Sequence, residues 1–316
     1  MKQLYNWILG GVLLISIVIA MLIGSTTIAL HDLWQGNAQA WHMLLTYRLP
    51  RIIIAVVGGA ILGGSGLLLQ IVLRNRLIDA SILGIMNGTQ FVTIGSLVLL
   101  PASLNWHVGV GALGGILIMI GWRLFIPQNR PRLQMVLIGI ATAMTFQALT
   151  NIASEGFGLP LPSLSTVTWA DVMQLLIIVV IGLMLLILAW PNLKFYALSA
   201  QQVRLLGFNE PRTMWLILIA VGIWTGALTA LLGVVFFLGA ILPQIARLMA
   251  PRTKSQQLLP ATMLWGSLLL INADTVARTI LAPKELATSA VLLAISGPLF
   301  AVMLLKGSRH ATTQRR

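Results

Sequence analysis

The chain contains no cysteine and very few charged residues. Only 9% of its 316 residues are charged, and only 7 residues are Asp or Glu. The absence of cysteine excludes disulfides, thiolate metal sites and thiol nucleophiles. A soluble domain carries roughly 25% charged residues. A chain with so little charge cannot cover a folded surface with polar groups, so it is not a soluble globule.

Sequence motifs for catalysis are also absent. No lysine follows a glycine, which excludes a P-loop, so any ATP-driven activity needs a separate ATPase. There is no HExxH sequence, no carboxylate pair at a useful spacing and no nucleophile-elbow motif. We therefore expect a protein that is not an enzyme and that holds no metal or cofactor of its own.

Hydrophobic residues are abundant, at 58% of the chain, and the mean hydropathy is +0.94. A helix needs about 20 apolar residues to cross a bilayer, and the alternation typical of membrane β-strands is missing. The sequence predicts an all-α, polytopic transmembrane helical bundle that forms a single domain over residues 1–316. About ten spans are expected, at 7–24, 52–73, 82–100, 108–126, 134–152, 172–190, 214–232, 234–249, 258–281 and 287–305.

Lysine and arginine set the predicted orientation. An even number of spans places both termini on one side, and that side receives all but four of the 20 lysines and arginines. Basic residues concentrate in cytoplasmic loops, so both termini are predicted to be cytoplasmic. The exceptions, on the outer side, are Arg48, Arg51, Arg278 and Lys284.

The outer arginines need an explanation, because an arginine at the bilayer centre costs about 2.5–3.5 kcal/mol on insertion scales. We expect Arg48, Arg51 and Arg278 near span ends, in water or at headgroup level. Asp274 and Arg278 are four residues apart, so they lie on one helix face and can pair. On these residues alone, the arginines are either interfacial anchors with a local ion pair or a binding surface.

Two spans have an unusual composition. Gly59 and Gly63 form a GxxxG pair, which is typical of closely packed helices. The fifth span is polar, and polar side chains inside a membrane usually face a bundle or a cavity. They either line a route through the membrane or bond to neighbouring helices. These residues are Thr142, Thr145, Gln147, Thr150 and Asn151.

Six segments, taken in order and spacing, resemble a known family. They are RLPR (48–51), LLQIVLRNRLIDASILG (68–84), ALSAQQVRLLGFN (197–209), GVVFFLGAILPQIARLM (233–249), LLPATMLWGSLLLINADTVARTILAPKELATSAV (258–291) and SGPLF (296–300). Together they are similar to the permease subunits of ABC importers for ferric siderophores, haem and cobalamin, the FecCD-type family. The chain departs from the family pattern at Arg76 and Ala80, where the family has proline, and at Gln244, where it has histidine. These departures bear on gating and ATPase contact.

The resemblance implies a set of partners. In this family two permease subunits, identical or related, form a pore in the bacterial plasma membrane, and two cytoplasmic ATPases use ATP and Mg²⁺. An extracellular binding protein docks through acidic residues on permease arginines. Those arginines match Arg48, Arg51 and Arg278, whose planar forks suit carboxylates.

The resemblance also assigns roles inside the membrane and beneath it. The cytoplasmic segment at about 191–213 is expected to be a coupling segment that sits in a groove on the ATPase, although an ordinary interfacial loop helix would have the same texture. Because the fifth and tenth spans border the family's translocation path, that path is expected to include the polar residues of the fifth span and Ser296, Gly297 and Pro298. The coupling residues are Gln202, Arg204, Leu205 and Gly207.

The expected cargo is an iron chelate. Ferric siderophores are the default because they are the largest group in the family, and haem and cobalamin stay open. The alternative function is an ion-coupled secondary transporter of a small solute. Such proteins usually bury ionisable residues near mid-membrane, whereas Asp274 and Arg278 lie near the outer end of their span.

Overall fold

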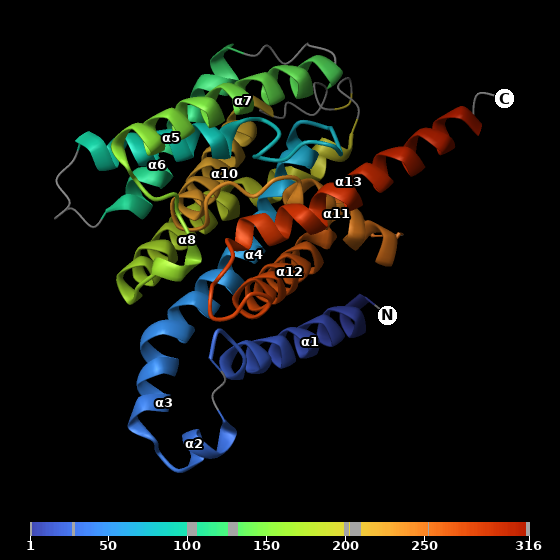
Figure 1. Ribbon diagram of the computed structural model, residues 1–316. Coiled ribbons are helices and arrows are strands. Elements are labelled where there is room, and N and C mark those ends of the chain that lie inside the picture. Colours follow the sequence, from blue (N-terminus) through green and yellow to red (C-terminus); the bar gives the residue numbers. More distant parts are fainter. Residues whose placement is uncertain are drawn as a thin grey trace.

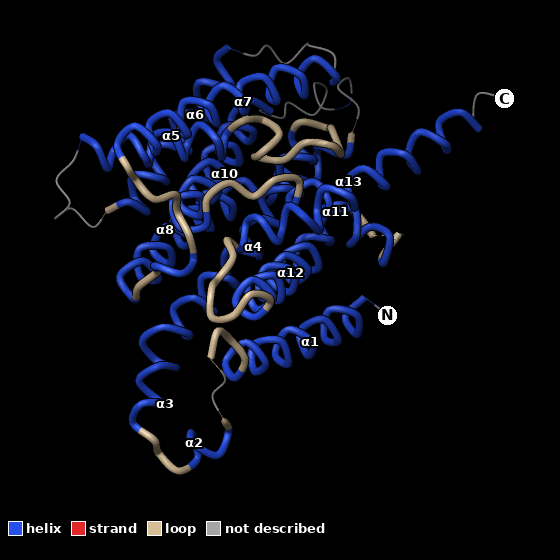
Figure 2. The backbone as a smooth tube through the Cα atoms, viewed as in Figure 1, coloured by secondary structure: helices blue, strands red, loops and turns tan. Residues whose placement is uncertain are grey.

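The structure is a computed structural model of the chain and describes residues 2–26, 29–99, 106–125, 132–198, 202, 210–251 and 253–313. All regular structure in these residues is helical, and none of it is strand (Figure 2). The all-α prediction is confirmed. The long helices are α1 (Lys2–Leu22), α4 (Leu49–Val72), α5 (Ile85–Leu99), α6 (His107–Phe125), α7 (Arg132–Phe157), α8 (Trp169–Ala189), α10 (Glu210–Leu232), α11 (Leu238–Met249), α12 (Leu259–Thr279) and α13 (Thr288–Thr313).

Short helices connect the long ones. The segment between α1 and α4 extends away from the bundle and carries two of them, α2 and α3 (Figure 1). A π-helix then leads directly into α4, so the first arginines of the chain lie on continuous helix. The short elements are α2 (Leu30–Trp34), α3 (Ala38–Met43), the π-helix Leu44–Arg48, and the 3₁₀-helices Leu164–Thr166, Trp190–Ala197 and Ser255–Leu258.

Within the described residues, 7 helical segments are long and apolar enough to cross a membrane. The long helices fall close to the expected spans, but α5 and α11 are shorter apolar helices and α12 is not among the 7 segments. The count of about ten spans therefore stays a prediction. The 7 segments are Leu4–Leu22, Ala38–Val72, His107–Phe125, Leu133–Phe157, Trp169–Tyr196, Glu210–Leu232 and Thr288–Leu305.

The expected eighth span is the element that differs most from a straight crossing helix. Helix begins only at Leu238, after Phe237 adopts a left-handed conformation with φ 63°, and Pro243 lies inside α11. A helix of 12 residues rises about 18 Å, which is less than the roughly 30 Å of a hydrocarbon core. The helix continues through Pro243, so the segment is shortened at its start, at Phe237, and is not broken at the proline.

The centre of the bundle is formed by α4 and α10, whose residues are buried on nearly all sides. A helix that is apolar all round is stable in such a position because every face meets another helix. Figure 1 shows α1 and α13 at the edge, with α7 on the opposite flank. The amino end of α1 and the carboxyl end of α13 point toward the same side, as an even number of spans requires (Figure 1).

Glycines bring the central helices into backbone contact. A Cβ on Gly59 would collide with the carbonyl of Gly266, and one on Gly63 would collide with the carbonyl of Thr262. The α4–α12 pair therefore depends on the absence of side chains at these positions. The predicted packing role of the GxxxG pair is confirmed.

Candidate functional site

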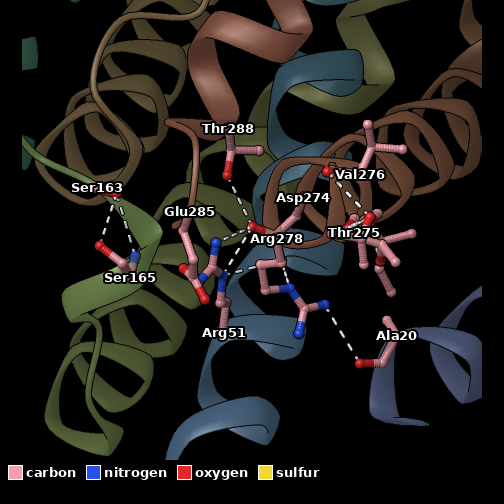
Figure 3. A network of polar contacts seen from close by, with 12 residues as sticks. Ala20, Arg51, Ser163, Ser165, Asp274, Thr275, Val276, Arg278, Glu285 and Thr288 are labelled. Atoms are coloured by element: carbon pink, nitrogen blue, oxygen red, sulfur yellow. Dashed lines mark hydrogen bonds and ion pairs between the residues drawn. The ribbon is translucent and has the colours of Figure 1, made fainter. Parts of the chain in front are cut away.

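Three arginines that are distant in sequence come together at one end of the bundle. Arg48 and Arg51 lie where the π-helix passes into α4, and Arg278 lies in the last turn of α12. Two acids join them, Asp274 from the preceding turn of α12 and Glu285 from the loop before α13 (Figure 3). We call these residues the arginine cluster.

Asp274 is the centre of this cluster. Its Oδ1 lies 2.8 Å from Arg51 Nη2 and accepts a hydrogen bond from Thr288 Oγ1 at 2.9 Å. Its Oδ2 lies 3.1 Å from Arg278 Nε. Arg51 Nη1 in turn lies 2.6 Å from Glu285 Oε2. These contacts tie α4, α12 and the start of α13 to one another (Figure 3).

Arg48 has different surroundings. Its Nη1 donates to the carbonyl of Met21 at 2.5 Å, and its Nη2 donates to the carbonyl of Thr26. In the part of the chain that the structure describes, no carboxylate forms an ion pair with it. The cluster therefore holds three cations against two anions, and the unbalanced charge lies on Arg48.

A pocket of about 390 Å³ opens beside the cluster. Its walls come from three segments, around 25–51, 165–167 and 278–285, which the sequence predicts on the same side of the membrane. The fold thus agrees with that grouping. Among the lining residues are Tyr47, Arg48, Arg51, Ser165, Arg278 and Glu285.

The three arginines lie near the ends of their helices, as expected, but the expectation that they are exposed to water is wrong for this subunit. Arg48, Arg51 and Arg278 are 5%, 6% and 3% exposed. Burial is tolerated because two of the guanidiniums are paired with acids and the third is bonded to carbonyls. The Asp274–Arg278 pair predicted from helix spacing is confirmed. The docking role of the arginines stays a prediction.

A second candidate site lies on α7. Asn87 Nδ2 of α5 donates to Gln147 Oε1 at 3.0 Å, and Gln147 Nε2 donates to Asn151 Oδ1 at 3.0 Å. These amides line a pocket of about 490 Å³ together with Phe236 and Phe237. Sequence reasoning missed Asn87, although a polar residue inside an apolar span was a usable signal.

The threonines of α7 behave differently from its amides. Thr142, Thr145 and Thr150 each donate to a backbone carbonyl of the preceding turn, so their hydroxyls are satisfied within the helix. Of the expected path residues on α7, Gln147 and Asn151 are the ones that line the pocket. The path assignment of all five stays a prediction.

The expected path residues on α13 lie next to the same pocket. Buried Ser296 donates to the carbonyl of Phe236 at 2.9 Å. Nothing lies within 4 Å of a Cβ placed on Gly297, and Pro298 is inside the helix. Phe300 stacks on Phe237 with ring centroids 4.8 Å apart. Helix α13 thus supports one wall of the pocket, and its transport role stays a prediction.

The expected coupling residues fall mostly outside the described residues. Arg204, Leu205 and Gly207 are not described, and Gln202 is exposed. The coupling role and the limits at about 191–213 stay predictions. Across the described ranges, no group of three or more His, Asp or Glu side chains is placed to hold a metal ion. The absence of a cofactor of its own also stays a prediction.

Two departures from the family pattern meet in the structure. Gln244 Nε2 of α11 donates to the carbonyl of Arg76 at 3.3 Å. Ala80, the third departure, is 5% exposed in the same α4–α5 connection. On the other side of that connection, Arg74 Nη2 lies 3.3 Å from Glu210 Oε1. The connection is therefore joined to both α10 and α11.

Comparisons with known proteins agree over nearly the whole chain. The sequence profile of the FecCD transport family matches residues 12–306. The protein named "Probable heme-iron transport system permease protein IsdF" from Staphylococcus aureus, strains MSSA476 and Newman, is 28% identical over 315 residues, covering 98% of each chain.

Solved structures are similar as well. A chain of a metal-chelate type ABC transporter in an inward-facing conformation superposes with a TM-score of 0.80 at 26% identity, covering 97% of this chain and 100% of that one. PsaBC from Streptococcus pneumoniae gives a TM-score of 0.59 at 14% identity over 86% of this chain and 95% of that one, a likeness of fold alone.

Proposed function

The chain belongs to the FecCD transport family, and from that membership we propose that it is the permease subunit of a binding-protein-dependent ABC importer. It moves an iron chelate into the cytoplasm across the bacterial plasma membrane, with about ten spans and both termini in the cytoplasm. A cytoplasmic ATPase dimer uses ATP and Mg²⁺, a second permease subunit completes the pore, and an extracellular binding protein delivers the cargo.

The observation that carries this proposal is the polar stripe on α7. Asn151 is exposed and Gln147 is half-buried on a helix that is long and apolar enough to cross a membrane. Polar side chains inside a membrane almost always face a bundle interior or a water-filled cavity. This face therefore borders the translocation path, which it shares with the second permease subunit.

Docking of the binding protein uses the pocket beside the arginine cluster. Arg51 and Arg278 already contact carboxylates of the same subunit, whereas among the described residues Arg48 contacts only uncharged acceptors, which are two carbonyls, a hydroxyl and a thioether sulfur. A carboxylate of the binding protein that enters the pocket is neutralised best by Arg48. Because charge-assisted pairs of this kind are geometrically strict, the acidic residue must reach into the pocket and not merely touch its rim.

A matched pair of variants tests docking. Arg48→Gln should weaken the affinity of the purified binding protein for the transporter by roughly tenfold or more, since close interfacial charge pairs couple by about 1.5–7 kcal/mol. Lys284→Gln removes an exposed cation on the same side, which is not among the residues lining the pocket, and should change the affinity little. Equal binding by wild type and Arg48→Gln would remove Arg48 from the interface.

The cargo is an iron chelate, and ferric siderophore remains the first choice on family size. Haem has support from the name of the S. aureus relatives, which are 28% identical. Uptake of radioactive iron presented as a ferric siderophore, as haem, or with cobalamin as a competitor distinguishes these cargoes in one assay.

Reconstitution tests the function itself. Proteoliposomes that contain the permease and its ATPase, with binding protein outside, should accumulate the chelate only with ATP. Accumulation by the permease alone, driven by an ion gradient, would identify a secondary transporter and overturn the proposal.

A further inference from the structure

A third pocket lies near the amino end of α7, next to the turn that joins α4 to α5. This inner pocket has a volume of about 690 Å³ and is lined by two arginines, Arg74 and Arg76, and by the apolar side chains of Leu77, Leu133 and Val136. Arg76 and Leu133 are exposed. The pocket thus combines a cationic edge with an apolar wall, on the side predicted to be cytoplasmic.

The turn that carries the arginines is held in place on several sides. Arg74 has a left-handed backbone with φ 49°, a conformation that few residues other than glycine adopt. Asn75 Oδ1 accepts from the backbone N–H of Leu77 at 3.1 Å, and Gln244 bonds the carbonyl of Arg76. The guanidiniums are therefore presented from a fixed backbone.

The charge at this pocket is not balanced. Arg74 has one acidic partner, Glu210 at 3.3 Å, and its Nε is buried with no hydrogen-bond partner. In the described part of the chain, Arg76 has no carboxylate within ion-pair distance. An unpaired buried N–H donor and an unneutralised guanidinium together favour an anionic ligand.

The inner pocket lies along the same face of α7 as the amide-lined pocket. Leu133 and Val136 lie three residues apart, and Ile140, Gln147 and Asn151 follow at helical spacing on the same face. The opposite wall is also continuous, since the turn at 74–77 leads to Ser81 and Ile82 at the amide-lined pocket. A cargo that leaves the neutral amide-lined pocket toward this end reaches the arginines last.

We propose that the inner pocket is an exit site for an anionic iron chelate, whose carboxylate or catecholate oxygens pair with Arg74 and Arg76 while its apolar part lies on Leu77, Leu133 and Val136. This inference rests on the proposed importer function and narrows its substrate class to anions. An exposed ion pair raises an affinity by about fivefold at most. Such pairing biases cargo toward the exit without trapping it.

Protection of a single cysteine tests the exit site. The chain has no cysteine, so Leu133→Cys in the complete transporter in nanodiscs gives one reactive position in the pocket on this subunit. We expect two anionic chelates, haem with its two ionised propionates and a ferric catecholate, to slow alkylation of this cysteine. The rate should be about fivefold lower than with haem dimethyl ester, because one exposed ion pair raises affinity by about that factor. Ser255→Cys, outside the pocket, should not be protected by any of them.

The same assay tests whether the charge of Arg76 is needed for binding. Adding Arg76→Gln to Leu133→Cys should remove the protection by the anionic chelates, and Arg76→Lys should retain it. Equal protection by haem and its ester, or protection unaffected by Arg76→Gln, would overturn the exit site while leaving ATP-driven uptake intact. Protection that follows the phosphatidylglycerol content of the nanodisc without any chelate would assign the pocket to lipid and also overturn it.

Discussion

At the scale of single residues, Asp274 is the group on which two of the outer arginines, Arg51 and Arg278, depend. It is 0% exposed and contacts both Arg51 and Arg278. Two buried guanidiniums that share one carboxylate are stable only while that carboxylate is charged, because losing one partner leaves an uncompensated buried charge. The cluster is therefore structural as well as a docking candidate.

Asp274→Asn should destabilise the protein strongly. Breaking a buried ion pair by removing one partner costs about 3–5 kcal/mol, and the change should appear as a large drop in the thermal unfolding midpoint in detergent. Glu155→Gln removes an exposed carboxylate of α7 and should leave the midpoint nearly unchanged. An equal midpoint for Asp274→Asn and wild type would mean that the cluster carries no structural charge pairing.

The sequence predicted this site only in part. Helix spacing predicts the Asp274–Arg278 pair because i,i+4 residues share a face. The contact between Arg51 and Asp274 joins residues 223 positions apart, and no local pattern reports such a contact. The burial of Arg48 and Arg51 was missed for the same reason, since their partners are supplied by other elements.

At the scale of elements, the α4–α12 contact is set by glycine. Both Gly59 and Gly63 face backbone atoms of α12 with no space for a side chain. Gly121 of α6, by contrast, has nothing within 4 Å of the position that a Cβ would take. The same residue type is thus essential for packing at one place and replaceable at another.

Gly63→Ala should lower the unfolding midpoint because the added methyl group pushes α12 away from α4. Overpacking of this kind costs about 1–3 kcal/mol. The matched variant Gly121→Ala should be neutral or slightly stabilising, since alanine favours helix by about 1 kcal/mol over glycine. The pair is compared by thermal unfolding in the same detergent, and a larger loss in Gly121→Ala would contradict the packing account.

The polar face of α7 gives a second prediction at this scale. In the assembled transporter, Asn151→Cys and Gln147→Cys should react with a hydrophilic thiol reagent, because the path contains water. Ile177→Cys, on an exposed apolar face of α8, should face lipid and react slowly. Unreactive cysteines at 147 and 151 would place this face of α7 against lipid or another helix.

Element positions were largely predictable because long apolar runs have few alternatives in a membrane. The exception is the segment at 234–249, where the left-handed conformation of Phe237 delays the start of α11. The hydropathy pattern does not indicate a change in backbone conformation at a single residue. The amide chain was missed in part because Asn87 comes from a neighbouring helix.

At the scale of the whole molecule, the direction of transport depends on which end of the bundle faces outward. The segments predicted on the outer side, which hold few lysines and arginines, meet at the arginine cluster, and the basic turn at 74–77 lines the inner pocket near the amino end of α7. Docking, transport and exit then follow one direction through the molecule. The distribution of lysine and arginine predicts this direction.

Labelling of single cysteines in intact cells tests that direction most directly. Ser165→Cys, exposed beside the arginine cluster, and Ser255→Cys, exposed at the opposite predicted side, are treated with a membrane-impermeant thiol reagent before and after permeabilisation. We expect label on position 165 in intact cells and on position 255 only after permeabilisation. The reverse pattern would place the arginines in the cytosol and contradict the account.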